Sequence, residues 1–246
     1  MVGLKDEYPA GFVDRGHSHS RTQLLYARSG VMSVVTEHCT YAVPPQRALW
    51  MQAGTRHEVS CRGDVSLRTL YIDPELEAHN RDPCHLVEVS DFLQSLILEV
   101  VNFDTASPMD ERQKLIVRLL LQEIWHMPDA PYKIPMPSDE RLSKACRMVN
   151  DNPSTQFDLD ALSSVACMSR RAFTRLFRQE TGTSFGEWQR QMRLVEALSL
   201  MESGKSISVT AYDVGYSSPS AFSAAFHRTF GVPPSQYRLP TRTFVY

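Results

Sequence analysis

Three histidines near the start of the chain have the residue type and the spacing of a ligand-binding or metal-binding site. His17 and His19 stand two positions apart, so on a β-strand their side chains point to the same face. His57 falls in a later predicted strand, from which its ring would converge with the other two. Three imidazoles and the amide oxygen of Gln23 form a donor set that suits a divalent transition metal, and such an ion is the cofactor that we would expect here.

Other roles are open to the same residues, because imidazoles also line pockets for small molecules or make structural hydrogen bonds. We therefore predict an effector pocket that contains His17, His19, Gln23, Trp50 and His57. If the effector is a metal, its expected ligands are His17, His19, Gln23 and His57.

A second group of chemically capable residues lies in the C-terminal half, on a predicted helix. Ser169 is expected to cap this helix, and Phe173 and Phe177 are expected to form its buried stripe. The opposite face carries side chains at i, i+3, i+4 and i+7, which lie side by side on a helix. Arginine can bind guanine O6 and N7 through two donors, or a phosphate, so this face predicts contacts with DNA. The residues concerned are Arg171, Thr174, Arg175 and Arg178, with Arg170 beside them.

The region around that helix occurs twice, at an offset of 49 residues. Residues 165–173 align with 214–222, and the register continues without a gap until Trp188 matches Tyr237. Such a repeat indicates one supersecondary unit used twice, here two short helices joined by a tight turn. In the second copy the outer face is far less basic, and it consists of Ser220, Ser223, Ala224 and His227.

The elements that must position these residues differ between the two halves of the chain. Short segments rich in Val, Leu, Tyr and Thr, separated by Gly and Pro, predict strands of a small antiparallel barrel or sandwich. These segments are 23–28, 31–36, 40–43, 47–51, 57–61 and 65–72. An apolar period of about 3.6 then predicts two helices, one after Ser90 and one over 110–126. The second helix has a broad apolar face, which suits either contact with the barrel on one side and a partner subunit on the other, or complete burial within a monomer.

The predicted fold class is therefore α+β, with a small antiparallel β-barrel, flanking helices and an all-α domain of two helix-turn-helix units. We expect the barrel over residues 1–80 and a helical pair that mediates dimerisation over 81–127. Residues 128–138 contain four prolines and predict an extended linker, and residues 139–246 form the DNA-binding domain.

Composition and charge agree with a DNA-binding protein of this kind. The net charge is −2, but residues 139–246 hold 13 Lys and Arg against 10 Asp and Glu, so the excess positive charge lies in that half. No apolar run approaches the roughly 18–20 residues of a membrane helix, and the first residues lack the pattern of a secretion signal. Five scattered cysteines without a C-x-x-C pair favour reduced thiols, so we expect a cytoplasmic protein with no membrane partner.

Two resemblances to known families support this interpretation. Residues 139–238 resemble the DNA-binding domain of the AraC/XylS transcription regulators, and GYSSPSAFSAAFHRTFGVPPSQYR is similar to that family's signature. His17, His19, Gln23 and Gly30 resemble the first cupin motif, with Gln in place of Glu, and residues 53–57 resemble the second, with Gln52 where proline is usual. The base-reading positions that the resemblance implies are Arg171, Thr174, Arg175, Ser220, Ser223 and Ala224.

Ala224 departs from the basic or polar residue often found at its position, which puts base reading by the second unit in doubt. The resemblance also implies promoter DNA, RNA polymerase and a second copy of the chain as partners, and a small molecule or metal as effector. The alternative is a metal-dependent cupin enzyme fused to a nucleic-acid-binding module. Two features weaken that alternative: Gln23 stands in place of a carboxylate, and no second acid or base is evident near the histidines.

Overall fold

The computed structural model describes residues 1–45, 47–73, 76, 82–104, 106–128, 133–152, 155 and 157–237. The chain divides into two compact units. The first comprises Met1–Thr36 and Tyr41–Lys133, and the second comprises Glu37–Thr40 with the described residues from Ile134 onward. Residues 129–132 of the expected linker and 238–246 at the end of the expected DNA-binding domain lie outside the described residues.

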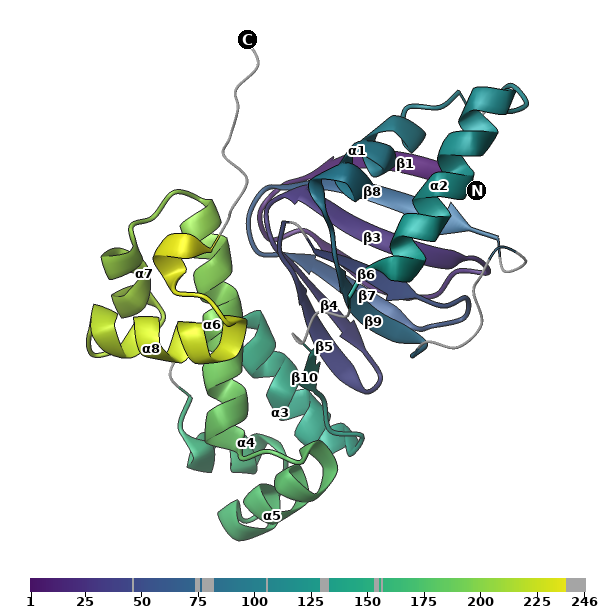
Figure 1. Cartoon of the computed structure of the whole chain (residues 1–246). Helices are drawn as coiled ribbons and strands as arrows, with labels where there is room; N and C mark the ends of the chain where they lie inside the picture. The colour runs from purple at the N-terminus through teal and green to yellow at the C-terminus, as the bar shows by residue number, and fades with distance from the viewer. Residues whose placement is uncertain are drawn as a thin grey trace. The chain divides into compact units, whose positions relative to one another are not determined.

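Two five-stranded sheets form the β-structure, in the orders β1-β8-β3-β6-β9 and β10-β5-β4-β7-β2 (Figure 1). The strands are β1 Val2–Tyr8, β2 Val13–His17, β3 Thr22–Ser29, β4 Met32–Thr36, β5 Cys39–Val43, β6 Arg47–Met51, β7 His57–Cys61, β8 Val65–Ile72, β9 Cys84–Glu88 and β10 Lys133–Pro135. All six segments predicted as strands are strands, because their β-branched and aromatic residues pack on a pleated, half-buried surface.

Side-chain alternation along the strands separates the two faces of the first sheet. Leu24 and Tyr26 of β3 pack in a core cluster with α1 (Asp91–Val100) and α2 (Glu111–His126), which cover this face in Figure 1. Gln23 and Leu25 of the same strand point the other way and line a cavity between the sheets. The period of two therefore decides which residues can form a site inside the barrel.

Four of the described strands, β1, β2, β9 and β10, lie outside the six predicted segments. β1 pairs with β8 along its whole length, although its middle carries the charged run Lys5–Glu7; it is an edge strand, and edge strands tolerate exposed charge. β9 pairs with β6 in the region where we expected only helices. β10 falls within the expected linker and takes an edge position, where the missing N–H of Pro135 costs little.

The two predicted helices after the barrel are present, and both begin at side-chain caps. The Ser90 hydroxyl accepts a hydrogen bond from the Leu93 N–H, and Asp110 and Gln113 form a capping box at the start of α2. These contacts satisfy N–H groups that a helix start leaves without partners.

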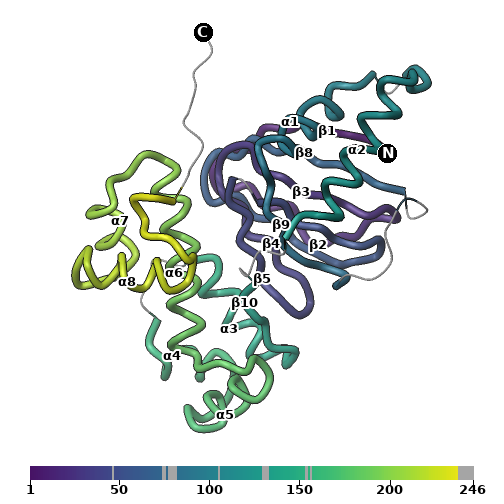
Figure 2. Tube along the Cα trace, in the orientation of Figure 1, coloured from purple at the N-terminus to yellow at the C-terminus, as the bar shows by residue number. Residues whose placement is uncertain are grey.

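The second unit is helical apart from the short strand segments that it includes (Figure 2). Its helices are α3 Glu140–Asp151, α4 Leu159–Val165, α5 Arg170–Thr181, α6 Phe185–Glu202, α7 Ile207–Asp213 and α8 Pro219–Phe230, followed by the 3₁₀ turn η2 Pro234–Gln236. Helix α6 contacts α3, α5 and α7, and it buries Trp188 and Met192 completely. It therefore connects the two predicted helix-turn-helix units, α4–α5 and α7–α8.

The structure confirms the internal repeat at the level of helix ends. Ser169 and Ser218 cap α5 and α8 by accepting a backbone hydrogen bond, and Gly182 and Gly231 end these helices at φ of 72° and 76°. A glycine adopts this left-handed conformation at little cost. Asp158 occupies the N-cap position of α4, but its side chain makes no capping hydrogen bond.

No helix among the described residues is long and apolar enough to cross a membrane.

Candidate functional site

The outer face of α5 presents cations to solvent, as the sequence predicts. Arg171, Arg175 and Arg178 are exposed, and within the described ranges none of the three forms an ion pair. Arg170 differs, because its guanidinium lies 3.3 Å from a carboxylate oxygen of Asp160 in α4. The Thr174 hydroxyl donates to the carbonyl of Arg170 at 3.0 Å and keeps its lone pairs for accepting. This stripe therefore presents three exposed guanidinium groups that, among the described residues, have no carboxylate partner.

A groove of about 600 Å³ runs beside this face. Its walls combine the arginines of α5 with the first turn of α6, where Ser184, Gly186 and Gln189 lie. These three residues were not predicted as part of the site, because the sequence of α6 indicates only an amphipathic helix between the two repeated units. Their position follows from the packing of α5 against α6.

The corresponding face of α8 is weakly polar. Ser220, Ala224 and His227 are exposed and Ser223 is half-buried, as the repeat predicts. The positions equivalent to Arg171 and Arg175 hold Ser220 and Ala224, so this face lacks the guanidinium groups of α5. It suits contacts with the DNA backbone or shape more than two-donor base reading.

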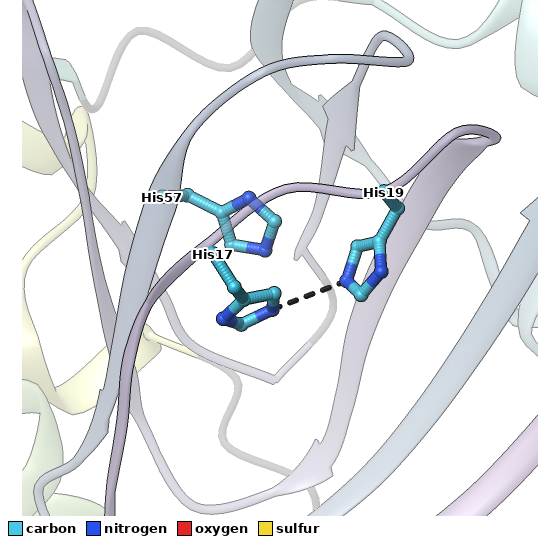
Figure 3. Close-up of side chains that lie close together, drawn as sticks. All are labelled: His17, His19 and His57. Atoms are coloured by element: carbon cyan, nitrogen blue, oxygen red, sulfur yellow. Dashed lines mark hydrogen bonds between the residues drawn. The ribbon is translucent and has the colours of Figure 1, made fainter.

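The three histidines of the first unit converge, as predicted (Figure 3). His17 ends β2, His57 begins β7, and His19 lies in the loop after β2 rather than in a strand. Nε2 of His17 lies 3.1 Å from Nε2 of His19, and one ligand atom from each of the three rings falls within 4.8 Å of the others. The paired Cα positions of His17 and His57 in the β2–β7 ladder bring the two sheet residues together.

Backbone carbonyls orient two of these rings. Nδ1 of His17 lies 2.8 Å from the Arg15 carbonyl, and Nδ1 of His57 lies 2.9 Å from the Thr55 carbonyl. Since a carbonyl only accepts, Nδ1 is the donor in each pair. Burial lowers the pKa of His57 below its ordinary value of 6.5, and burial followed by the neighbouring His17 lowers that of His19. The lowered pKa values favour the neutral form of both rings, which is the form that can bind a metal ion.

Of the other two predicted pocket residues, Gln23 lines the cavity and Trp50 does not. Gln23 lines the inter-sheet cavity with the histidines, and its Nε2 donates to the Tyr71 hydroxyl at 3.4 Å. Trp50 was predicted in the same pocket, and this prediction is wrong. Trp50 lies opposite Leu24 in the β3–β6 register and packs in the core cluster with α1 and α2, so alternation turns it away from the cavity.

The cavity is also lined by Tyr71 and Asp14, which lie outside the predicted set of five pocket residues. Tyr71 contacts His19 with ring centroids 5.0 Å apart, and a carboxylate oxygen of Asp14 lies 3.5 Å from Nδ1 of His17. Asp14 sits three residues before His17 on β2, but a register shift between them brings the carboxylate toward the ring. A bulge of this kind has no clear signal in one sequence.

Comparison with known proteins places both units. The model of the AraC-like ligand binding domain matches residues 1–126, about half of the chain, and that of a helix-turn-helix domain matches residues 162–239. The chain belongs to the AraC family of transcriptional regulators. This AraC-family chain is 28% identical over 221 residues to the regulator NimR of Escherichia coli. The matched region covers 90% of the chain and 81% of NimR. It is 33% identical over 103 residues to the regulator RipA of Corynebacterium glutamicum, which covers 42% of the chain and 31% of RipA.

A similar solved structure is that of ToxT from Vibrio cholerae, with 15% identity, a TM-score of 0.41, and coverage of 96% of this chain and 98% of ToxT. The match covers about a third of RipA, and a similar share of several other curated regulators. The predicted family and fold class are confirmed, and NimR, which matches most of the chain, is a transcriptional regulator rather than an enzyme. The cupin-enzyme alternative is therefore set aside.

Proposed function

We propose that this AraC-family regulator reads specific bases through α5 and responds to a small molecule or metal held between the sheets of its N-terminal domain. The observation that carries the proposal is the stripe formed by Arg171, Arg175 and Arg178, exposed and without ion pairs among the described residues. Arginines left without carboxylate partners are free to meet guanine edges and phosphates. The α8 face then adds backbone contacts and little sequence preference.

Selection of bound fragments from genomic DNA tests this proposal. The wild-type chain should enrich a defined sequence, and Arg171→Ala or Arg175→Ala should relax the preference at one base pair each. Arg28→Ala is the matched control, because it removes one exposed arginine from the N-terminal unit. Equal enrichment by all four proteins would contradict reading by α5.

The effector acts in this proposal by binding one conformation of the chain better than another. Its site is the cavity that contains the three histidines, because polar side chains converge there from both sheets. Repeating the fragment selection with and without added candidate effectors tests the link. An effector that binds the N-terminal domain but leaves DNA affinity unchanged would contradict it.

We also propose that α2 mediates a homodimer. Leu115 and Leu119, one turn apart on this helix, are 63% and 42% exposed, whereas Leu120 and Ile124 are buried in the core cluster. An apolar pair on a solvated helix face is well suited to a second copy of the same helix. Sedimentation of wild type and of Leu115→Glu/Leu119→Glu should show a dimer and a monomer, and two dimers would contradict this surface.

RNA polymerase is the remaining proposed partner. As a transcription regulator, the bound chain would act by changing how polymerase engages a promoter that contains the selected sequence. Transcription from such a promoter in a purified system should change on adding wild type and not on adding Arg175→Ala. An equal change with both proteins would contradict regulation through this site.

A further inference from the structure

The size of the inter-sheet cavity distinguishes between the two classes of effector. It holds about 70 Å³, whereas pockets for drug-sized molecules hold roughly 300–1,000 Å³. A space of this size takes a few water molecules or an ion. Polar side chains line the cavity from both sheets, and the three histidines come together at one place in it.

We propose that the N-terminal domain binds one divalent transition metal ion through Nε2 of His17, His19 and His57. This inference rests on the proposed function, because it names the effector class of the same site. The ion would join the end of edge strand β2 and the loop after it to the start of β7.

The tautomers of two rings are already those that a metal requires. Because Nδ1 of His17 and Nδ1 of His57 donate to backbone carbonyls, Nε2 of each of these rings carries the lone pair. The Nε2 lone pair of His17 accepts a hydrogen bond from Nε2–H of His19, so metal binding requires His19 to take the Nδ1–H tautomer and the ion to replace this hydrogen bond. Histidine ligands usually make such a second hydrogen bond to a carbonyl or carboxylate, which holds the ring in place. The Asp14 carboxylate, 3.5 Å from Nδ1 of His17, adds a negative charge on the side away from the ion.

The spacing of the nitrogen atoms fits a tetrahedral ion. Bonds of 2.0–2.1 Å at tetrahedral angles place neighbouring ligand atoms roughly 3.3 Å apart. Nε2 of His17 and Nε2 of His19 lie 3.1 Å apart, and no pair of ligand atoms in the cluster exceeds 4.8 Å. Small rotations of the side chains would bring the nitrogen of His57 to the same spacing from the other two nitrogens, without a change in the strands.

His57 provides an independent observation. Its side chain is 3% exposed, and Nε2 is buried with no hydrogen-bond partner in the part of the chain that the structure describes. A buried acceptor without a partner costs about 1–3 kcal/mol, so such atoms are rare unless something else binds them. The amide oxygen of Gln23 is also buried and without a hydrogen-bond partner among the described residues, and it lines the same cavity. A bound ion would satisfy His57 and offers Gln23 a fourth coordination position.

The donor set selects the kind of ion. Three neutral imidazoles suit Zn²⁺, Co²⁺, Ni²⁺ or Cu²⁺, whereas Mg²⁺ and Ca²⁺ prefer oxygen ligands. The three rings bring no negative charge of their own, so the ion keeps most of its charge and its fourth position can exchange water or the Gln23 oxygen.

Titration of the chelator-treated, full-length chain with Co²⁺ tests the proposal. We expect one equivalent to bind, with the visible absorption bands of a low-coordinate Co²⁺ site, and no displacement by excess Mg²⁺. His17→Ala, His19→Ala and His57→Ala should each weaken binding by at least about tenfold. His38→Ala, which removes an exposed histidine outside the cluster, should leave binding unchanged.

His17 and His19 are half-exposed, so their variants keep the test valid if the buried His57 is needed for folding. Absence of a one-equivalent site in the wild type, or equal binding by the cluster variants and His38→Ala, would overturn the proposal. DNA binding is measured on the same samples. A chain that binds its DNA without taking up Co²⁺ overturns the metal site alone, and a chain that takes up Co²⁺ without binding DNA overturns only the regulator proposal.

Discussion

Phe177 meets Trp188 edge-to-face in the first helix-turn-helix unit, with ring centroids 5.9 Å apart. Phe226 meets Tyr237 in the same way in the second unit, at 5.4 Å, and both residues stand 49 positions later. The buried contacts of the two units are thus equivalent. Their helix caps are equivalent too, since Ser169 and Ser218 begin the second helix of each unit and Gly182 and Gly231 end it.

The outer surfaces of the same two helices are different. Arg171, Thr174, Arg175 and Arg178 of α5 correspond to Ser220, Ser223, Ala224 and His227 of α8. Close packing restricts what a core position accepts, whereas an exposed helical position accepts almost any residue. The fold therefore requires the cores of the two units to be alike, whereas the chemistry of their surfaces can differ.

The largest expected effect concerns the shared core. Phe177→Ala and Phe226→Ala should each lower the free energy of unfolding by about 3–5 kcal/mol, because both remove a fully buried ring. Urea denaturation of the two variants measures this. A large loss in one variant and almost none in the other would mean that the cores are not equivalent.

The next effect concerns the most divergent pair of surface positions. Arg175→Ala should weaken specific DNA binding by about 1–3 kcal/mol, and Ala224→Arg should restore a basic side chain to α8 and tighten binding. Fluorescence anisotropy with a selected DNA fragment compares both variants with wild type. Tighter binding by Ala224→Arg on the selected fragment but not on a scrambled one would show that α8 can read bases; no change on either would mean that α8 does not approach the DNA.

A smaller effect is expected in the salt dependence of binding. Arg178→Ala should reduce the slope of log affinity against log salt by about 0.9, the value for one lost phosphate contact. His227→Ala, at the equivalent position of α8, should leave the slope near that of wild type, because it removes no guanidinium group from the surface. Equal slopes for the two variants would contradict the assignment of Arg178 to phosphate.

The smallest effect is expected at the start of α3, the helix that precedes both helix-turn-helix units. Arg141 and backbone N–H groups hold the pKa of Asp139, the N-cap of α3, at about 2 against an ordinary 3.8. Because the pKa is lower in the folded state, the ionised group stabilises the fold above about pH 4, and that contribution is lost as the pH falls toward 2. Asp139→Asn should unfold with less dependence on pH over this window. An unchanged acid profile would mean that Asp139 does not contribute.

Several features of the fold follow from the sequence because their signals are local. The helix caps and the apolar period predict the starts of α1 and α5 and both ends of α2 to within about two residues. The exposure of Arg171 and Arg175 follows from the same periodicity, since Phe173 and Phe177 occupy the opposite side.

Other features depend on contacts between distant segments. β1 is a strand because β8 accepts it as a neighbour, although its own residues are mostly polar. Trp50 was placed in the wrong layer because residue type gives no information on which side of a sheet faces the cavity. Asp14 reaches His17 only because of a bulge in β2.

The amino-acid sequence alone thus determined the family, the repeated helix-turn-helix units and the residues of their outer faces, because periodicity and capping act over a few residues. Only the tertiary structure decided that Nε2 of His57 is buried beside His17 and His19, without a hydrogen-bond partner among the described residues. It also decided that Trp50 faces the helices. The physical reason is that sheet register and layer packing join residues far apart in the chain, and a side chain's neighbours across a sheet are set by its partners as much as by itself.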